Sequence, residues 1–485
     1  MRRYFTFLLQ GSRRINTISG FLFLILSSSL FSQTDHYWAQ QYGATATLTG
    51  GAMIGGVRDN SAIFYNPGAV SFIQFPSLSV TANLYKMDKI FIDDGAGDGI
   101  NLNSAQISIF PQIISGMVQL KKLPRFKFVY SLLTRNFDNV LMNTRYTDDD
   151  FTAQSPDVQA YVGSFNFANQ LNEQWFGLGV GFRVNDRLGI GVSVFGSYRT
   201  QTNQMRDHLR EISQIDSSFW VATITLEDAI KFRTVSGLIK AGLAYETGQW
   251  KIGLTVTTPS FRVYGRGDIE REMSIYALSE NPQDTSISYI ITDRQNDARA
   301  YYHHPWALGA GVEYASPKTR IALSAEYYFK IKNYVLMAPA SDPFVYPPEI
   351  ADSAFIRDIT ENFLRIQTES RPVCNIGIGL EQQLWERITL LAGFHTDFYN
   401  YKKSDNSDVL LVSSGVWDLY HISAGLSYTR SKQVITAGFS YAFSPNVPID
   451  PFAIINPYQN FSGKANVFAQ TFAFIIGYTY LFPRE

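Results

Sequence analysis

The chain has 485 residues, of which 15% are aromatic and 17% are charged, with a formal net charge of -1. A mean hydropathy of -0.08 excludes a bundle of transmembrane helices, which would need repeated apolar runs of about 20 residues. The same value is compatible with a transmembrane β-barrel, in which lipid-facing apolar residues alternate with polar lumen residues. No basic surplus indicates a nucleic-acid partner. The single cysteine, Cys374, can form no intramolecular disulfide, and we expect it to be a small buried or lumen-facing residue.

Residues 1–32 are typical of a secretory signal peptide. Arginines cluster in the first 14 residues, and an apolar core at residues 21–26 follows that is too short to span a bilayer. Small residues near Ser32 suit cleavage close to Gln33. The sequence therefore predicts export by the Sec route.

Residues 33–76 show no strand alternation and contain a glycine-rich stretch. Within them, residues 61–65 are predicted to form a short helical turn that ends at Asn66, because the residue before a proline is disfavoured in the helical region. Asn66, Pro67 and Gly68 are predicted to form a turn, with Pro67 fixing φ and Gly68 free to adopt positive φ.

From Ser77 onward, apolar residues recur at every second position. In residues 472–482 the even positions are aromatic or apolar, whereas Gly477 and Thr479 lie among the odd ones. Further examples of this alternation lie in residues 176–182, 306–314, 376–380, 420–428 and 435–443. A period of two is typical of β-strands with one apolar face and one small or polar face.

A soluble β-sandwich also alternates, so the lengths of the connections decide between the two folds. Short turns alternate strictly with long polar connections, as the periplasmic turns and extracellular loops of outer-membrane barrels do. The short turns are predicted at residues 121–125, 185–187, 247–249, 316–319, 385–387 and 430–432. The long connections are predicted at residues 93–103, 143–174, 200–233, 266–300, 338–362, 403–418 and 445–464.

These connections divide residues 77–485 into about fourteen strands, an even number as in bacterial barrels. The prediction is an all-β fold, a transmembrane antiparallel β-barrel whose first and last strands pair, with residues 33–76 as a small plug inside it. Residues 219–226 and 286–291 are interpreted as hairpins in the long loops rather than as two further barrel strands.

The segment around Asn66 resembles a known signature. It is similar to the Asn-Pro-Ala motif in the N-terminal plug of FadL-type outer-membrane transporters, with Gly68 where the family usually has alanine. The matching plug residues are Ser61, Ala62, Ile63, Phe64, Tyr65, Asn66, Pro67 and Gly68. Residues 251–259, 304–312 and 418–426 resemble strands of the same family, in the expected order.

The resemblance implies passive uptake of long-chain fatty acids or other hydrophobic compounds across the outer membrane of a Gram-negative bacterium. The ligand would enter an apolar pocket, which replaces the missing lipid, and leave through a lateral opening in the wall while the plug moves. Residues 126–142 would form the strand at that opening. Arg135, Asn136 and Asp138 in this strand are out of place on a lipid face, which fits either an inward bend or a position above the membrane.

The expected partners are a hydrophobic small molecule, outer-membrane lipid and lipopolysaccharide. The last strand ends near Phe482 and resembles the signal that the outer-membrane assembly machinery recognises. A FadL-like barrel that acts in protein secretion or surface attachment is the alternative, because the long loops could bind a partner protein.

No enzyme, cofactor or metal site is predicted. The nearest acid–histidine pairs, His395 with Asp397 and His421 with Asp418, lack a Gly-x-Ser-x-Gly elbow, so a barrel enzyme is only a minor alternative. His303-His304 has no third metal ligand at suitable spacing and is expected to lie in an aromatic girdle at the membrane interface. Acidic clusters at residues 93–98 and 148–150 are interpreted as solvated loop charge, with Ca²⁺ binding as the alternative.

Overall fold

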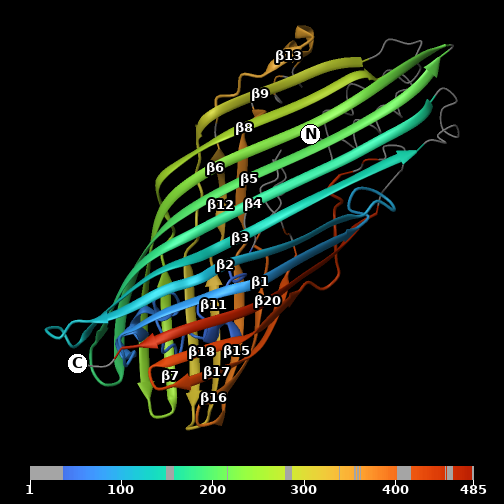
Figure 1. The fold of residues 1–485 in the computed structure, drawn as a ribbon. Helices are drawn as coiled ribbons and strands as arrows, with labels where there is room; N and C mark the ends of the chain where they lie inside the picture. Colours follow the sequence, from blue (N-terminus) through green and yellow to red (C-terminus); the bar gives the residue numbers. More distant parts are fainter. Residues whose placement is uncertain are drawn as a thin grey trace.

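In the computed structural model, long antiparallel strands enclose a short N-terminal segment (Figure 1). The structure describes residues 36–482 except for 149–157, 216, 279–286, 338, 354–356, 358–359, 361, 401–414, 416, 454 and 456–462. The predicted signal peptide, residues 1–32, lies outside the described residues. No helix in the described part of the chain is long and apolar enough to cross a membrane.

The barrel is closed by 14 antiparallel strands that follow one another in chain order. They are β1 (Ser77–Asp93), β2 (Leu102–Gln119), β3 (Phe126–Asp148), β4 (Val158–Arg183), β5 (Leu188–Ile215), β6 (Ser218–Thr247), β7 (Trp250–Thr257), β10 (Ala307–Ala315), β11 (Thr319–Tyr328), β15 (Val373–Trp385), β16 (Ile388–Asp397), β17 (Leu419–Arg430), β18 (Gln433–Phe443) and β20 (Ala465–Leu481). β1 pairs with β20 from Ser77↔Leu481 to Asp93↔Asn466, which closes the barrel. The predicted fold, strand number and closure are confirmed.

The outward face of the barrel is apolar and the inward face is small or polar, as the alternation predicts. On β7, Leu254 is exposed on the outside while its neighbours Gly253 and Thr255 are buried inside. The expectation for Cys374 is wrong, because its side chain is exposed. It shares the outward face of β15 with Ile376 and Ile378, since residues two apart lie on the same face of a strand.

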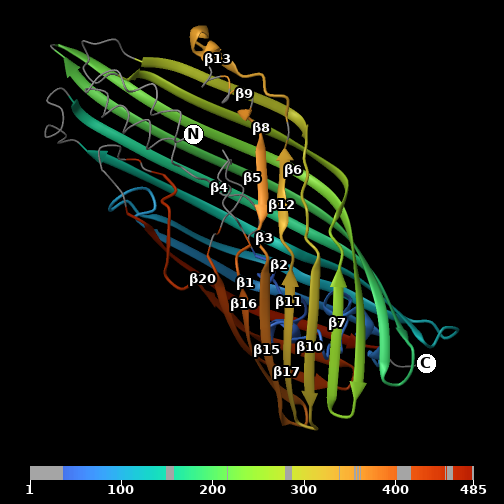
Figure 2. The same cartoon turned by 180° about the vertical axis from the view of Figure 1, so that it is seen from behind.

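Several strands continue far beyond the barrel. β4, β5 and β6 have 26, 28 and 30 residues, well above the ~9 to 11 needed to span a bilayer. Three further strands extend this side of the sheet, and a separate ribbon stands beside it (Figure 2). The further strands are β8 (Phe261–Leu278), β9 (Ile287–Arg299) and β13 (Phe344–Tyr346), and the ribbon pairs β12 (Ile331–Met337) with β14 (Ile366–Ser370).

Much of three predicted loops is therefore strand, so the predicted loops at residues 143–174, 200–233 and 266–300 are wrong. Their outward face lacks the apolar residues that mark a strand of the barrel wall, as at Asn166 and Gln170, whereas apolar residues such as Phe165 and Phe167 are buried on the inner face. Residues 219–226 begin β6 and pair with the end of β5, and residues 287–291 begin β9 and pair with β8. The first hairpin continues barrel strands β5 and β6, and the second joins β8 and β9 beyond the barrel, so neither adds a strand to the closed barrel.

The N-terminal segment fills one end of the barrel with three short helices: α3 (Ala44–Leu48), α4 (Ala62–Tyr65) and η1 (Pro67–Phe72). The predicted helical turn and its end are confirmed, since α4 stops at Asn66, which is extended at φ -154°. The predicted turn at residues 66–68 is wrong, and Gly68 does not use the positive φ that was open to it. A 3-10 helix starts at Pro67, and Gly68 is not among the glycines at positive φ.

Glycines of the barrel wall face this plug. A Cβ on Gly68 would lie 2.7 Å from the carbonyl oxygen of Gly242, and a Cβ on Gly379 would lie 2.6 Å from that of Thr49. The wall glycines against which the plug packs are Gly181, Gly189, Gly191, Gly242, Gly253, Gly311, Gly377, Gly379, Gly393, Gly425, Gly438 and Gly477. Absent side chains thus let the backbone of the N-terminal segment lie directly on the wall.

Candidate functional site

Asn66 joins the plug to the barrel wall. Its side chain donates to the carbonyl oxygens of Ile54, at 2.9 Å, and Leu243 on β6, at 3.0 Å, and accepts from the Gly68 amide at 3.0 Å. Asn66 is fully buried, so no water replaces these bonds. Its side chain thus joins Ile54 and Gly68 of the N-terminal segment and fixes them on β6.

The other motif residues build the plug core. Phe64 packs edge-on against Tyr42, with ring centroids 4.4 Å apart. The Tyr65 hydroxyl accepts from the Tyr42 amide at 2.9 Å and donates to Gln41 at 2.8 Å. Ala62 is fully buried in the same cluster. These contacts tie α4 to residues 36–43, which we call the N-terminal stretch.

Ser61 precedes α4 and binds an acidic side chain. The amide of Ser61 donates to the Asp59 carboxylate at 2.9 Å, and its hydroxyl donates to the same oxygen. Burial raises the pKa of the Asp59 carboxyl, against the opposing effect of these two hydrogen bonds. The pair closes the loop that leads into the motif.

Strand β3 is irregular at Arg135. The β3–β4 register shifts between Thr134 and Asn136, so Arg135 forms a β-bulge. The Arg135 side chain is buried inside the barrel, where it donates to the Tyr37 carbonyl at 2.7 Å. Its guanidinium also lies 5.3 Å from the ring centre of Trp175. Through Arg135, the bulge therefore fastens the N-terminal stretch to the barrel wall.

The β2–β3 ladder stops next to this bulge. It runs from Gln119↔Lys127 to Ile113↔Leu133 and no further, although both strands continue. Pro111 lies just beyond the last pair, and it has no amide with which to continue a ladder. We call the unladdered part, residues 102–112 of β2 and 134–148 of β3, the open seam.

Side chains replace the missing backbone bonds along the open seam. Thr134 Oγ1 donates to the Pro111 carbonyl at 2.7 Å, and the Leu141 amide donates to Ser104 Oγ at 3.1 Å. Further contacts across the seam are Asn139 to Gln106 at 3.4 Å and the stacked rings of Phe110 and Phe137 at 4.9 Å. These contacts join the two strands along the seam, where the continuous ladder that closes the rest of the wall is absent.

A buried carboxylate, Glu173 on β4, lies opposite the bulge. Asn136 Nδ2 donates to it at 2.9 Å, so a predicted site residue belongs to its hydrogen-bond network. The other donors are Trp175 Nε1 at 2.7 Å, Ser197 Oγ at 2.8 Å, Arg199 Nη1 at 3.1 Å and His304 Nε2 at 2.8 Å. Sequence reasoning missed this network, because its members come from three strands, β3, β4 and β5, and from the β9–β10 connection.

The expectation for His304 is accordingly wrong. It does not lie in an interfacial girdle but is buried, bonded to Glu173 and set edge-on against Trp175 with ring centroids 5.2 Å apart. His303 instead packs against the ring of Tyr334. Among the residues that the structure describes, no three His, Cys, Asp or Glu side chains are placed to hold one metal ion.

The acid–histidine pairs considered for catalysis have other contacts. His421 on β17 stacks on its cross-strand neighbour His395 with ring centroids 4.1 Å apart. Asp397 accepts from the Trp38 amide at 2.9 Å and lies 3.2 Å from His36 Nδ1. Asp397 therefore binds the N-terminal stretch, which it fastens to β16.

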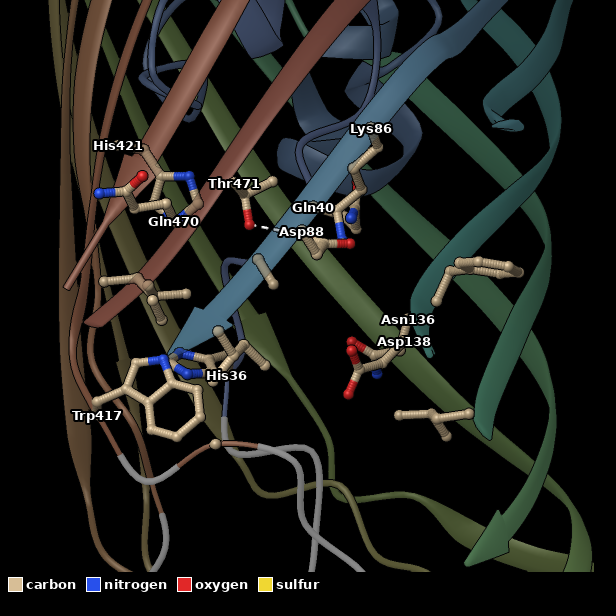
Figure 3. A pocket seen from close by; sticks show the side chains of 17 residues that line it. His36, Gln40, Lys86, Asp88, Asn136, Asp138, Trp417, His421, Gln470 and Thr471 are labelled. Carbon is tan, nitrogen blue, oxygen red and sulfur yellow. Dashed lines mark hydrogen bonds and ion pairs between the residues drawn. The ribbon is translucent and has the colours of Figure 1, made fainter. Parts of the chain in front are cut away.

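A pocket of about 120 Å³ lies in the lumen between the N-terminal stretch, the open seam and the β17–β20 side of the wall (Figure 3). Asn136 and Asp138 line one side, and His421 and Gln470 line the opposite side. The remaining polar lining residues are His36, Gln40, Lys86, Asp88 and Thr471, and the apolar ones include Ile90, Phe137, Leu171, Trp417 and Leu419. Of the predicted opening residues, Asn136 and Asp138 thus meet this pocket, and Arg135 meets the plug instead.

Similar proteins were sought by sequence and by structure. No protein-family model matches the sequence, and no curated protein matches it. Among solved structures, a FadL homologue of Pseudomonas aeruginosa is 15% identical, with 94% of this chain and 100% of that chain covered, at a TM-score of 0.54. The chain has the FadL-type fold.

Two further solved structures are similar to this chain over nearly its whole length. The toluene transporter TodX of Pseudomonas putida is 13% identical over 92% of this chain and 100% of its own, at a TM-score of 0.57. The toluene transporter TbuX of Ralstonia pickettii is also 13% identical over 92% of this chain and 100% of its own, at a TM-score of 0.53. In this FadL-type barrel the pocket, bulge and seam are therefore placed within a fold that is matched along nearly its whole length.

Proposed function

We propose that the protein is an outer-membrane channel that takes up small hydrophobic molecules by passive diffusion. The observation that carries the proposal is the position of the lumen pocket, whose lining includes Asn136, Phe137 and Asp138 at the open seam. Similarity to the fold of transporters named for toluene supports the substrate class. The proposal includes no catalytic step and leaves long-chain fatty acids as one possible class of cargo.

The proposed path of the ligand follows from which parts of the barrel are blocked. The plug backbone rests on wall glycines at one end of the barrel, so straight passage would require it to leave. At the seam, in contrast, only side-chain contacts join β2 to β3. A hydrophobic ligand that passes from water through the pocket into the lipid beside the wall gains free energy, because its apolar surface is removed from water. We therefore propose lateral exit through the seam.

The plug motif and the bulge have roles in this proposal. Asn66 would keep the plug seated, and Arg135 would link the seam to the N-terminal stretch through the Tyr37 carbonyl. Because residues 36, 39 and 40 line the pocket, displacement of this stretch would change the pocket and the seam together.

Crosslinking across the seam tests the route. Cysteines replace Gln106 and Asn139 in a Cys374→Ala background, and a short cleavable bifunctional thiol reagent joins them. Uptake of labelled toluene into proteoliposomes is expected to fall to the level of empty vesicles and to recover after cleavage. The matched control joins Val118→Cys to Phe128→Cys, which lie opposite each other in the closed part of the ladder. Full uptake through the crosslinked seam would refute lateral exit.

Surface docking is the second candidate function. The end of the sheet beyond the barrel exposes large side chains, with Phe219 69%, Trp220 51% and Tyr276 66% exposed. Such exposure in a projecting sheet suits binding of another protein at the cell surface. Capture of one secreted protein by the intact barrel, lost when these three residues are replaced by serine, would support docking. Unchanged capture would refute it.

A further inference from the structure

His421, which lines the lumen pocket, carries a buried ring nitrogen that the described residues leave without a hydrogen bond. Nε2 of His421 has no hydrogen-bond partner among the described residues, although His421 is only 7% exposed and lines the pocket. A buried polar atom without a partner costs about 1 to 3 kcal/mol, which a ligand that bonds to it would recover. The stacked His395 ring, 4.1 Å away, disfavours a charge on both rings, and a neutral imidazole offers one donor and one acceptor.

The fixed charges of the pocket disfavour an anion. Lys86 is 2.7 Å from one oxygen of Asp88, and Thr471 donates to the other oxygen at 2.7 Å, so this lysine is already neutralised. His36 is matched in the same way by Asp397, at 3.2 Å. Asp138 adds a second carboxylate to the lining, and no second lysine or arginine is found among the described lining residues.

The size of the pocket limits the cargo further. At about 120 Å³, it is close to the ~150 Å³ of an engineered protein cavity that binds benzene. It is smaller than the ~300 Å³ at which pockets for drug-sized ligands begin. The ring of Trp417 and the side chains of Ile90 and Leu171 are apolar parts of the lining, against which one aromatic ring can pack.

We infer that the pocket takes an uncharged one-ring hydrophobe with a single hydroxyl, of the phenol or benzyl alcohol class, rather than a carboxylate amphiphile. The hydroxyl would bond to His421 Nε2, and the ring would pack against the apolar side chains of the lining. The inference rests on the proposed uptake function and names its substrate class.

A series that keeps the ethylbenzene frame and varies the para substituent tests it: ethylbenzene, 4-ethylphenol and 4-ethylbenzoate. Binding to the full protein in lipid nanodiscs is measured by equilibrium dialysis, with empty nanodiscs correcting for partition into lipid. The phenol is expected to bind about fivefold more tightly than the hydrocarbon, as for one additional neutral hydrogen bond. The benzoate is expected to bind most weakly of the three.

Two variants test whether the preference for the phenol over the hydrocarbon and the benzoate arises in the pocket. His421→Phe keeps a ring against His395 but removes the nitrogen, so the phenol should bind no better than ethylbenzene, whose own affinity stays unchanged. Asp138→Asn removes one negative charge and should strengthen benzoate binding by roughly tenfold, as for a partly buried charge several ångströms away. If His421→Phe does not assemble, the benzoate affinity of Asp138→Asn still tests whether the charges of the pocket exclude an anion, and an unchanged affinity would refute it.

The outcomes separate this inference from the uptake proposal. Equal binding of ethylbenzene and 4-ethylphenol, or tightest binding of the benzoate, would overturn the substrate class while uptake of hydrophobes stands. If none of the three binds above the empty nanodiscs, the pocket is not the binding site, and the uptake proposal fails together with the inference.

Discussion

Replacing Asn66 by alanine should loosen the plug while the barrel stays intact. The substitution removes three buried hydrogen bonds, to Ile54, Leu243 and Gly68. At about 1 kcal/mol for each bond, the seated plug loses ~3 kcal/mol relative to states in which it is detached. Since 1.4 kcal/mol is a factor of ten, the detached population should rise about 100-fold.

Hydrogen exchange measures this population. Amides of α4 and η1 that exchange through plug detachment should do so about 100-fold faster in Asn66→Ala, with the strand amides of β16 to β18 unchanged. Asn185→Ala is the matched control, because Asn185 also caps backbone amides but lies exposed in the β4–β5 turn. If plug amides exchange at the same rate in Asn66→Ala and the unsubstituted protein, Asn66 does not hold the plug.

Two more substitutions test the contacts that seat and support the site. Glu173→Gln leaves the fully buried Arg199 without its carboxylate and should destabilise the barrel by ~3 to 5 kcal/mol, measured as unfolding at lower urea concentration on a gel. Adding Arg199→Met to Glu173→Gln should recover part of this loss, and equal stability of all three proteins would contradict an ionic network. Gly379→Val places a side chain where the Thr49 carbonyl oxygen lies 2.6 Å from a Cβ, so the plug should be displaced and ion conductance across a planar bilayer should rise. Gly196→Val is the control: no atom lies within 4 Å of its Cβ, so its conductance should equal that of the unsubstituted protein.

The parts of the fold that depend on local pattern could be predicted from the sequence. Alternation with a period of two identifies the barrel strands, because one face meets lipid and the other the lumen. The short turns are punctuated by polar residues, and Pro67 ends α4 through a steric effect on its immediate neighbour. Each of these signals lies within a few residues of the chain.

The parts that depend on contacts across the barrel could not be predicted in the same way. Glu173 is one more polar residue on a lumen face until β3, β5 and the β9–β10 connection bring their donors to it. The wall glycines follow the small-residue face of the strands, yet only the plug explains why the side chains are missing. Gly68 shows the same limit. A glycine after a proline suggests a turn, whereas here it allows close approach to Gly242.

The open seam is best understood through the cost of unpaired backbone in a membrane. An unsatisfied amide or carbonyl in hydrocarbon costs several kcal/mol, so a wall cannot simply omit its ladder. Pro111 removes one donor outright, and the hydroxyls of Thr134 and Ser104 bond to backbone groups that would otherwise lack a partner. A wall joined by side chains can part by rotamer changes, whereas a wall joined by a continuous ladder would have to break many backbone bonds together. For the lateral exit that we propose, this difference would make the β2–β3 seam the place where a hydrophobe leaves at the lowest cost.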